Sequence, residues 1–185
     1  MTAFNIIKNL FLKNAGKSYI GENISIPSHL LSCAETANNK KLHNEVVVAA
    51  CLHDIGHFLA VDNSNGYGVS DHARLGAGFL KGLGFTDRIC TAVDLHADAK
   101  RFLVSKNPEY YYDLSPASKI TFELQGGYMT PDENLDFMDN LYYSDAIKIR
   151  ECDDQSKSID MSKKFIIENL YKYKILIDEY SKTEK

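Results

Sequence analysis

The adjacent pair His53-Asp54 lies in the mostly apolar stretch Cys51-Leu52-His53-Asp54-Ile55-Gly56-His57. Imidazole and carboxylate groups together suit borderline metals such as iron, manganese, zinc or nickel. An aspartate offers two oxygens, so Asp54 can bridge two cations. His57 follows His53 by four residues, which places both on one face of the predicted helix. Two polar core residues satisfied by hydrogen bonds are the alternative, and this stretch alone favours neither interpretation.

Further potential metal ligands lie in other segments that are predicted to be helical: His29, His72, His96 and Asp153. Apolar neighbours flank each of them and would turn it toward the interior. Chance burial of a potential ligand in four separate helices is a poor explanation, so the set favours a metal centre. Asp154 is adjacent to Asp153, and either carboxylate can be the ligand. His43 follows a lysine-rich loop and is predicted to be solvated.

Hydrophobic periodicity predicts the helices that must position these residues. They cover residues 2–13, 27–38, 43–62, 71–82, 86–103, 115–124, 132–151 and 161–181. Turn-forming stretches such as residues 63–68 separate them, and no strand-like alternation persists. Neither a linker nor an internal repeat divides the chain. We therefore expect an all-α fold with a single domain over residues 1–185, a length that suits one substantial core.

Composition limits the partners that the protein can have. The net charge is −4 without a long basic run, which argues against nucleic-acid binding but leaves room for a small anionic substrate. No apolar run reaches membrane-spanning length, and residues 4–12 have the spacing of an amphipathic helix rather than of a signal peptide. The four cysteines form no Cys-x-x-Cys pair. Buried free thiols in a reducing cytoplasm are the economical interpretation.

The order His … His-Asp … Asp resembles the HD superfamily, most of whose members are phosphohydrolases that use one or two metals. His72 and His96 match the pattern of its two-metal branch. The resemblance implies a helical bundle around a dinuclear metal centre. It assigns one ion to His29, His53, Asp54 and Asp153, and the other to Asp54, His72 and His96, with Asp54 as the bridge.

Most of the chain, from Tyr19 to Lys157, further resembles the small HD-domain di-iron oxygenases that cleave the carbon–phosphorus bond of 1-hydroxyphosphonates. The stretches that carry this resemblance are Tyr19-Ile20-Gly21-Glu22, Leu114-Ser115-Pro116-Ala117-Ser118 and Leu124-Gln125-Gly126-Gly127. It implies an Fe(II)/Fe(III) pair, O2, and 2-amino-1-hydroxyethylphosphonate or its N-trimethyl analogue as substrate, with phosphate and a carboxylic acid as products. A metal-dependent HD phosphohydrolase acting on a nucleotide or phosphomonoester is the alternative.

The same resemblance assigns catalytic roles to Tyr19 and His57, and substrate contacts to Glu22, His57, Lys100, Ser118 and Arg150. Tyr19 would cap the substrate iron before substrate binds, and Glu22 would meet the substrate amine. Lys100, Ser118 and Arg150 would hold the phosphonate. In relatives a glutamate often precedes the first histidine, whereas this chain has Ser28 there.

Helical spacing supports the two cations independently. Lys100 lies four residues after His96 and Arg150 three residues before Asp153, so each shares a helical face with a candidate ligand. A phosphonate dianion needs such cations, and an arginine can bind two of its oxygens at once. The alternatives are ordinary ones: Lys100 as a solvated surface lysine beside Arg101, Arg150 paired with Glu151 or Asp154, and Tyr19 as a packed tyrosine.

Overall fold

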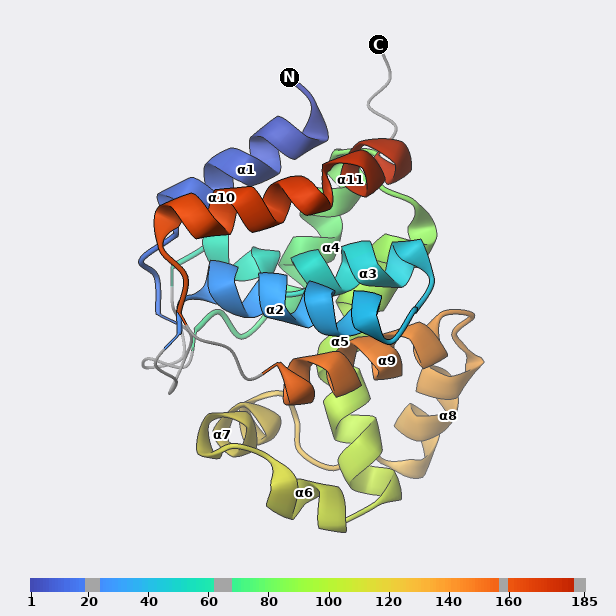
Figure 1. Ribbon diagram of the computed structural model, residues 1–185. Helices are drawn as coiled ribbons and strands as arrows, with labels where there is room; N and C mark the ends of the chain where they lie inside the picture. Colours follow the sequence, from blue (N-terminus) through green and yellow to red (C-terminus); the bar gives the residue numbers. More distant parts are fainter. Residues whose placement is uncertain (19–23, 62–67, 157–159, 182–185) are drawn as a thin grey trace.

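The computed structural model describes residues 1–18, 24–61, 68–156 and 160–181, and within these ranges the regular structure is helical (Figure 1). The α-helices are α1 (Ala3–Lys13), α2 (Ile26–Asn39), α3 (Asn44–Leu52), α4 (His72–Gly82), α5 (Asp87–Lys106), α6 (Glu109–Asp113), α7 (Pro116–Leu124), α8 (Pro131–Asp139), α9 (Tyr143–Gln155), α10 (Lys163–Lys172) and α11 (Lys174–Tyr180). A short 3-10 helix, η1, spans Ile55–Phe58. The predicted all-α class is confirmed.

The helices surround α3. Helices α1, α10 and α11 pack together on one side, and α10 and α11 also contact α2 and α3 respectively (Figure 1). On the other side α5 and α9 pack against each other and against α3, and α4 lies along α5. Helices α6, α7 and α8 lie at the far end of α5 and α9 in Figure 1. None of the helices in the described ranges is both long and apolar enough to cross a membrane.

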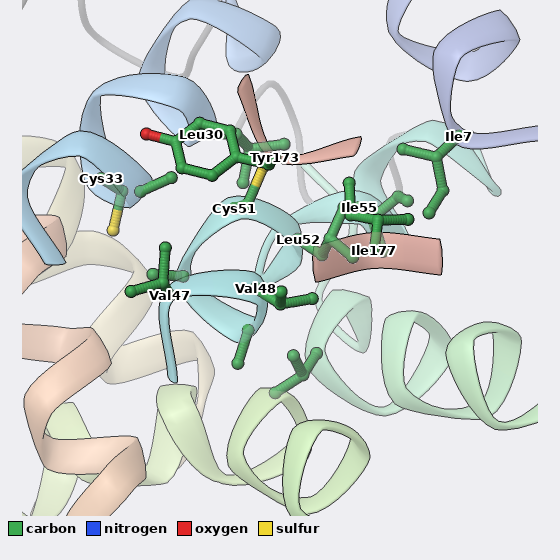
Figure 2. Close-up of a cluster of buried hydrophobic side chains, with 14 of the residues drawn as sticks. Ile7, Leu30, Cys33, Val47, Val48, Cys51, Leu52, Ile55, Tyr173 and Ile177 are labelled. Carbon is green, nitrogen blue, oxygen red and sulfur yellow. The ribbon is translucent and has the colours of Figure 1, made fainter. Parts of the chain in front are cut away.

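Helix α3 is apolar on every side, and its residues 46–52 are all buried. Figure 2 shows Val47, Val48, Cys51 and Leu52 among side chains from α1, α2 and α11. A helix of this kind is stable only when other helices cover it completely, which explains its central place. All four cysteines are free and buried, as the sequence predicted. The helix ends at Leu52, so the polar residues that follow start inside the protein.

Several predicted helix bounds were wrong. The predicted helix 43–62 ends at Leu52, and the chain turns through His53 and Asp54 into η1, so His53 and His57 do not share one α-helix. The predicted helix 132–151 is two helices, because Asn140 takes an extended conformation (φ −73°, ψ 130°). The predicted helix 161–181 divides at Tyr173, and α6 was not predicted.

Gly56 allows η1 to lie directly against the start of α4. A Cβ atom at position 56 would lie 1.9 Å from the carbonyl oxygen of His72 and 2.7 Å from its carbonyl carbon. Both are backbone atoms, so no side-chain rearrangement relieves the clash. Because Gly56 has no side chain, the turn that carries Asp54 can lie close to His72, which is 18 residues after Asp54 in the chain.

Candidate metal centre and anion pocket

Two groups of potential ligand atoms share Asp54. The first contains His29, His53 and Asp54, the second contains Asp54, His72 and His96, and within each group the atoms lie within 4.8 Å of one another. Asp54 Oδ2 lies 3.4 Å from His53 Nε2, whereas Oδ1 lies 3.3 Å from both His72 Nε2 and His96 Nε2. The two oxygens of one buried carboxylate thus face different groups, which is the arrangement of a bridging ligand.

Backbone carbonyls fix the tautomer of three of these histidines. Nδ1 lies 2.9 Å from Ala50 O in His53, 2.9 Å from Val69 O in His72 and 2.6 Å from Val93 O in His96. A carbonyl oxygen only accepts hydrogen bonds, so each Nδ1 carries the hydrogen and each neutral ring keeps a lone pair on Nε2. All three lone pairs are therefore directed toward Asp54, as metal ligation requires.

The packing of these atoms fits a metal ion. His72 Nε2 and His96 Nε2 are 3.1 Å apart, and two facing lone pairs at that distance repel each other unless a cation lies beside them. Two nitrogens about 2.1 Å from a shared ion, at roughly a right angle, would be about 3 Å apart. In addition, the buried His53 Nε2 makes no well-aligned hydrogen bond to the described residues. The donor set suits a borderline metal.

Asp153, rather than Asp154, joins the first group. Asp153 lies in the last turn of α9, and its Oδ1 is 3.0 Å from His29 Nε2. Burial alone would raise the pKa of this carboxyl, but Arg150 and His29 hold it well below its usual range. Asp154 turns instead toward Tyr110 and Arg150. Of the two neighbouring aspartates, Asp153 is therefore the one that lies beside a candidate histidine ligand.

The start of α2, which carries His29, is held by a side chain that the sequence did not suggest. Ser28 is fully buried, and its hydroxyl lies 3.0 Å from Asp160 Oδ1 and 2.8 Å from Ser25 Oγ. Asp160 also accepts the Ser25 backbone N–H at 2.9 Å. The short side chain of Ser28 and an aspartate distant in sequence therefore anchor this helix.

His57 differs from the candidate ligands in its tautomer. Its Nδ1 accepts the backbone N–H of Val69 at 3.1 Å, so the neutral ring carries its hydrogen on Nε2. Burial lowers the pKa of His57, which keeps the ring neutral. The ring stacks on His72 with centroids 4.2 Å apart, and its Nε2 lies 3.9 Å from Asp54 Oδ1. His57 thus offers a donor where the other histidines offer lone pairs, which suits a substrate contact.

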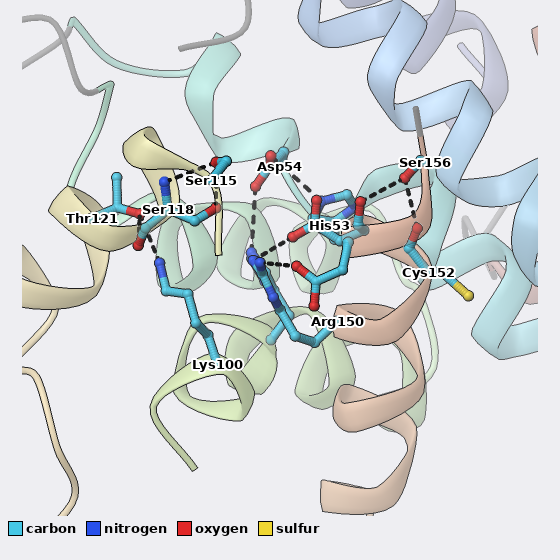
Figure 3. A network of polar contacts seen from close by, with 12 residues as sticks. His53, Asp54, Lys100, Ser115, Ser118, Thr121, Arg150, Cys152 and Ser156 are labelled. Atoms are coloured by element: carbon cyan, nitrogen blue, oxygen red, sulfur yellow. Dashed lines mark hydrogen bonds and ion pairs between the residues drawn. The ribbon is translucent and has the colours of Figure 1, made fainter. Parts of the chain in front are cut away.

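One cavity of about 60 Å³ adjoins both sets of residues. The histidine–aspartate groups contribute Asp54, His72, His96 and Asp153 to its lining. The lining also contains Lys100, Ser118 and Arg150, as well as Ser115, Thr121 and Gln125 at α7. Figure 3 shows Lys100 beside Ser118 and Thr121, with Arg150 and Asp54 nearby. Only 3% of Lys100 and 6% of Arg150 is exposed. Lys100 is therefore not a solvated surface lysine, and that alternative was wrong.

Lys100 is a buried cation without a carboxylate partner among its hydrogen bonds in the described structure. Its Nζ donates to Thr121 Oγ1 at 2.7 Å, and Thr121 in turn donates to Ser118 O at 3.2 Å (Figure 3). Burial, followed by repulsion from Arg150, lowers the pKa of Lys100 to about 7. The site therefore holds a lysine whose charge an incoming anion would stabilise.

Arg150 is held by three partners. Its Nη1 donates to Asp153 Oδ2 at 2.5 Å, its Nη2 donates to Asp154, and its Nε donates to Tyr110 Oη at 3.1 Å. The alternative pairing with Asp154 is therefore real, but it does not turn Arg150 away, because Arg150 also lines the cavity. Glu151 is instead 4.0 Å from Lys40.

The sequence missed Ser115, Thr121 and Gln125 as cavity residues. Their spacing, with Ser118, follows one face of α7 and its caps, and this polar stripe was the available signal. Two predicted residues, Tyr19 and Glu22, lie outside the described residues, as does Lys157.

The chain matches the HD domain family over residues 27–124, a segment that contains His29 to His96 as well as Lys100 and Ser118. It is 36% identical over 150 residues to the hydroxymethylphosphonate dioxygenase of Gimesia maris, covering 79% of this chain and 74% of that protein. It is 33% identical over 162 residues to the 1-hydroxy-2-(trimethylamino)ethyl phosphonate dioxygenase (glycine-betaine-forming) of Leisingera caerulea, covering 84% and 80%.

An uncharacterised protein of Acanthamoeba polyphaga mimivirus is 34% identical over 180 residues, covering 95% of this chain and 80% of that protein. The resemblance seen in the sequence is thus confirmed over most of the chain. The chain belongs to the HD-domain family, in a group of oxygenases that includes both of these phosphonate dioxygenases.

Proposed function

We propose that the chain is a di-iron oxygenase that cleaves the carbon–phosphorus bond of a 1-hydroxyphosphonate. The observation that carries this proposal is a single cavity lined both by the histidine–aspartate groups and by the buried cations Lys100 and Arg150. The names of the two phosphonate dioxygenases support the same chemistry. A phosphonate dianion pairs with the cations, and its C1 then lies between them and the metal ligands.

In this proposal His29, His53, Asp54 and Asp153 hold one iron, and Asp54, His72 and His96 hold the other. An Fe(II)/Fe(III) pair supplies the redox chemistry with O2 when it is bound. The chain contributes the shared carboxylate of Asp54 and the Nε2 lone pairs, which the carbonyl contacts of Nδ1 keep in place. Burial of the groups keeps bulk water away from the reacting centre.

The remaining residues bind and orient the substrate. Lys100 and Arg150 pair with phosphonate oxygens, and Ser118 donates a hydroxyl hydrogen bond to them. His57 donates its Nε2 hydrogen toward the oxygens of the substrate at the metal side of the cavity. As the resemblance implies, Tyr19 would hold the substrate iron before substrate binds, and Glu22 would meet a cationic group on C2.

The reaction balances without an external reductant. One hydroxyphosphonate dianion and one O2 give one carboxylate, one hydrogen phosphate and one proton. The carbon–phosphorus bond breaks, C1 is oxidised to the carboxylate level, and one oxygen atom is added to each fragment. Substrates without a hydroxyl on C1 would lack the oxidation level that this stoichiometry needs.

The test measures O2 uptake and phosphate release by the iron-loaded protein. The substrates are hydroxymethylphosphonate, 2-amino-1-hydroxyethylphosphonate and its N-trimethyl analogue, each assayed with and without O2. We expect one O2 consumed per phosphate released, and no release under anaerobic conditions. Anaerobic cleavage of a phosphomonoester or nucleotide at a comparable rate would contradict the proposal and favour the phosphohydrolase. Comparison of the three substrates also shows which group on C2 the pocket prefers.

A further inference from the structure

Tyr110 and Asp154 form a closed ring of hydrogen bonds with Arg150. Arg150 donates from Nη2 to Asp154 Oδ1 and from Nε to Tyr110 Oη, and Tyr110 Oη donates to Asp154 Oδ2. The tyrosine hydroxyl is therefore an acceptor from the guanidinium and a donor to the carboxylate at once. Burial raises the pKa of Tyr110, so the hydroxyl keeps the hydrogen that this double role needs.

Neither Tyr110 nor Asp154 is among the described residues that line the cavity. Both act on it through Arg150, which does line it. A guanidinium has five N–H donors in one plane, and the three contacts to Asp153, Asp154 and Tyr110 use three of them. One N–H on each Nη remains. Because three contacts fix the plane of the group, they also fix the direction of these two remaining donors.

Tyr110 is the one of the three partners of Arg150 described above that comes from outside α9, and it restricts the guanidinium in a way that the other two do not. Asp153 and Asp154 lie on the same helix as Arg150, at i+3 and i+4, so they alone would allow the guanidinium to follow the helix surface. Tyr110 comes from α6 and packs against the apolar cluster of Val104, Leu114 and Phe122. Its Oη accepts from Arg150 Nε beside the Asp154 contact, although the two residues are 40 positions apart in sequence.

Tyr110 also weakens the competition between the neighbouring carboxylates and a substrate anion for the guanidinium of Arg150. The carboxylates of Asp153 and Asp154 both attract the positive charge that a substrate anion must use. The hydroxyl of Tyr110 donates to Asp154 and so takes up part of the hydrogen-bonding capacity of that carboxylate. Without the hydroxyl, Asp154 would be free to accept a second guanidinium N–H, one of the two that would otherwise remain for the anion.

We propose that Tyr110 is a positioning residue for the anion pocket: through Arg150 and Asp154, it aims two guanidinium N–H groups at the phosphonate of the substrate. This inference rests on the proposed function for the identity of the anion. It does not depend on turnover, since the aim of Arg150 determines how tightly any small phosphonate binds.

The experiment compares wild type, Tyr110→Phe and the control Tyr112→Phe, all loaded with iron. Tyr112 lies on the same helix and is 70% exposed. The dissociation constant of methylphosphonate is measured by calorimetry, and iron content and Tm are measured on the same samples. We expect Tyr110→Phe to raise this Kd by about five- to tenfold, as the loss of one ordinary hydrogen bond would, with unchanged iron content. Tyr112→Phe should bind as wild type does.

A double-mutant cycle with Arg150→Lys separates aiming from packing. Lysine keeps the charge but has no Nε–H for Tyr110 to accept, so Tyr110→Phe should change Kd by less than twofold in that background. An equal effect of Tyr110→Phe in both backgrounds, or a lower Tm with an unchanged Kd in the wild-type background, would overturn the proposal. Binding needs no chemistry, so an inactive wild type that binds methylphosphonate would contradict the proposed reaction, and the cycle would still decide the role of Tyr110.

Discussion

Replacing Lys100 with methionine should make the protein more stable and less active. Methionine has a similar length and no charge, so it fills the space of the lysine stem beside Thr121. Burial lowers the pKa of Lys100 from 10.5 to about 7, which means that the folded protein holds the charged form at a considerable free-energy cost. Such a cost is typical of a residue that is kept for function.

The two effects have calculable sizes. The difference between a pKa of 10.5 and one of about 7 corresponds to about 5 kcal/mol at 1.36 kcal/mol per pH unit, an upper bound for the gain in free energy of unfolding. Half of this gain in free energy of unfolding would raise Tm by about 5 °C or more in a chain of this size. In the opposite direction, loss of a charge-assisted contact to the phosphonate of about 1.5–3 kcal/mol should lower kcat/KM by about ten- to a hundredfold.

The stability effect has a definite pH dependence. Between pH 7 and pH 10.5 the unfolded chain binds the Lys100 proton more tightly than the folded protein does, so wild-type stability rises with pH across this window. The advantage of Lys100→Met is therefore complete below pH 7 and is lost as the pH approaches 10.5. Substrate affinity of the wild type should fall above pH 7, because a bound anion raises the pKa of Lys100 and binding then requires the uptake of a proton.

Thermal unfolding from pH 6 to pH 10 and steady-state kinetics on hydroxymethylphosphonate, with iron content measured, test this reasoning. The control is Lys164→Met, because the Lys164 side chain is 81% exposed and should change neither quantity. A lower Tm than wild type at pH 7, or wild-type kcat/KM in Lys100→Met, would refute the view that a buried charge is held there for an anion.

Three further predictions concern the metal groups and their support. Asp54→Ala should lose both irons, because one residue serves both groups, whereas His72→Ala should retain one; iron analysis per chain distinguishes them. Asp153→Asn should lower iron content and Asp154→Asn should not, and equal losses would contradict the assignment. Gly56→Ala should lower the free energy of unfolding by about 1–3 kcal/mol, measured by urea denaturation, because its Cβ would meet the His72 carbonyl.

Much of the fold followed from the sequence because helical periodicity is a local property. The predicted bounds of α2, α4 and α7 were within one residue of the observed ones. The end of α3 was not predictable in this way, since the apolar pattern continues through Ile55 and Phe58 while the chain turns at His53 and Asp54. That turn depends on the close approach of η1 and α4 at Gly56, which is a tertiary contact.

The candidate ligands were predictable for a different reason. Histidine and aspartate are seldom buried without a partner, so their apolar surroundings in the sequence were informative. Thr121 and Tyr110 gave no comparable signal, because such residues are common at surfaces and their contacts join segments far apart in the chain. The tautomer of His57 could not be predicted from the sequence either, because it depends on the contact of its Nδ1 with the backbone N–H, rather than the carbonyl, of Val69.

The two cations of the pocket differ in what they contribute. Arg150 is paired with Asp153 and Asp154, so this trio already carries a net negative charge before any anion binds. Lys100 donates only to a neutral hydroxyl in the described structure. Its charge is therefore the one that an anion would compensate, whereas Arg150 supplies donors of fixed direction.

Removing Arg150 would leave two carboxylates uncompensated: that of Asp153 beside His29, with 8% of its side chain exposed, and that of the partly exposed Asp154. Breaking a buried pair such as Arg150–Asp153 costs about 3–5 kcal/mol. Arg150→Ala should therefore disturb the carboxylate beside His29 as well as the anion pocket. Lys100 is the cleaner probe of anion binding, because its loss leaves no buried partner charge behind.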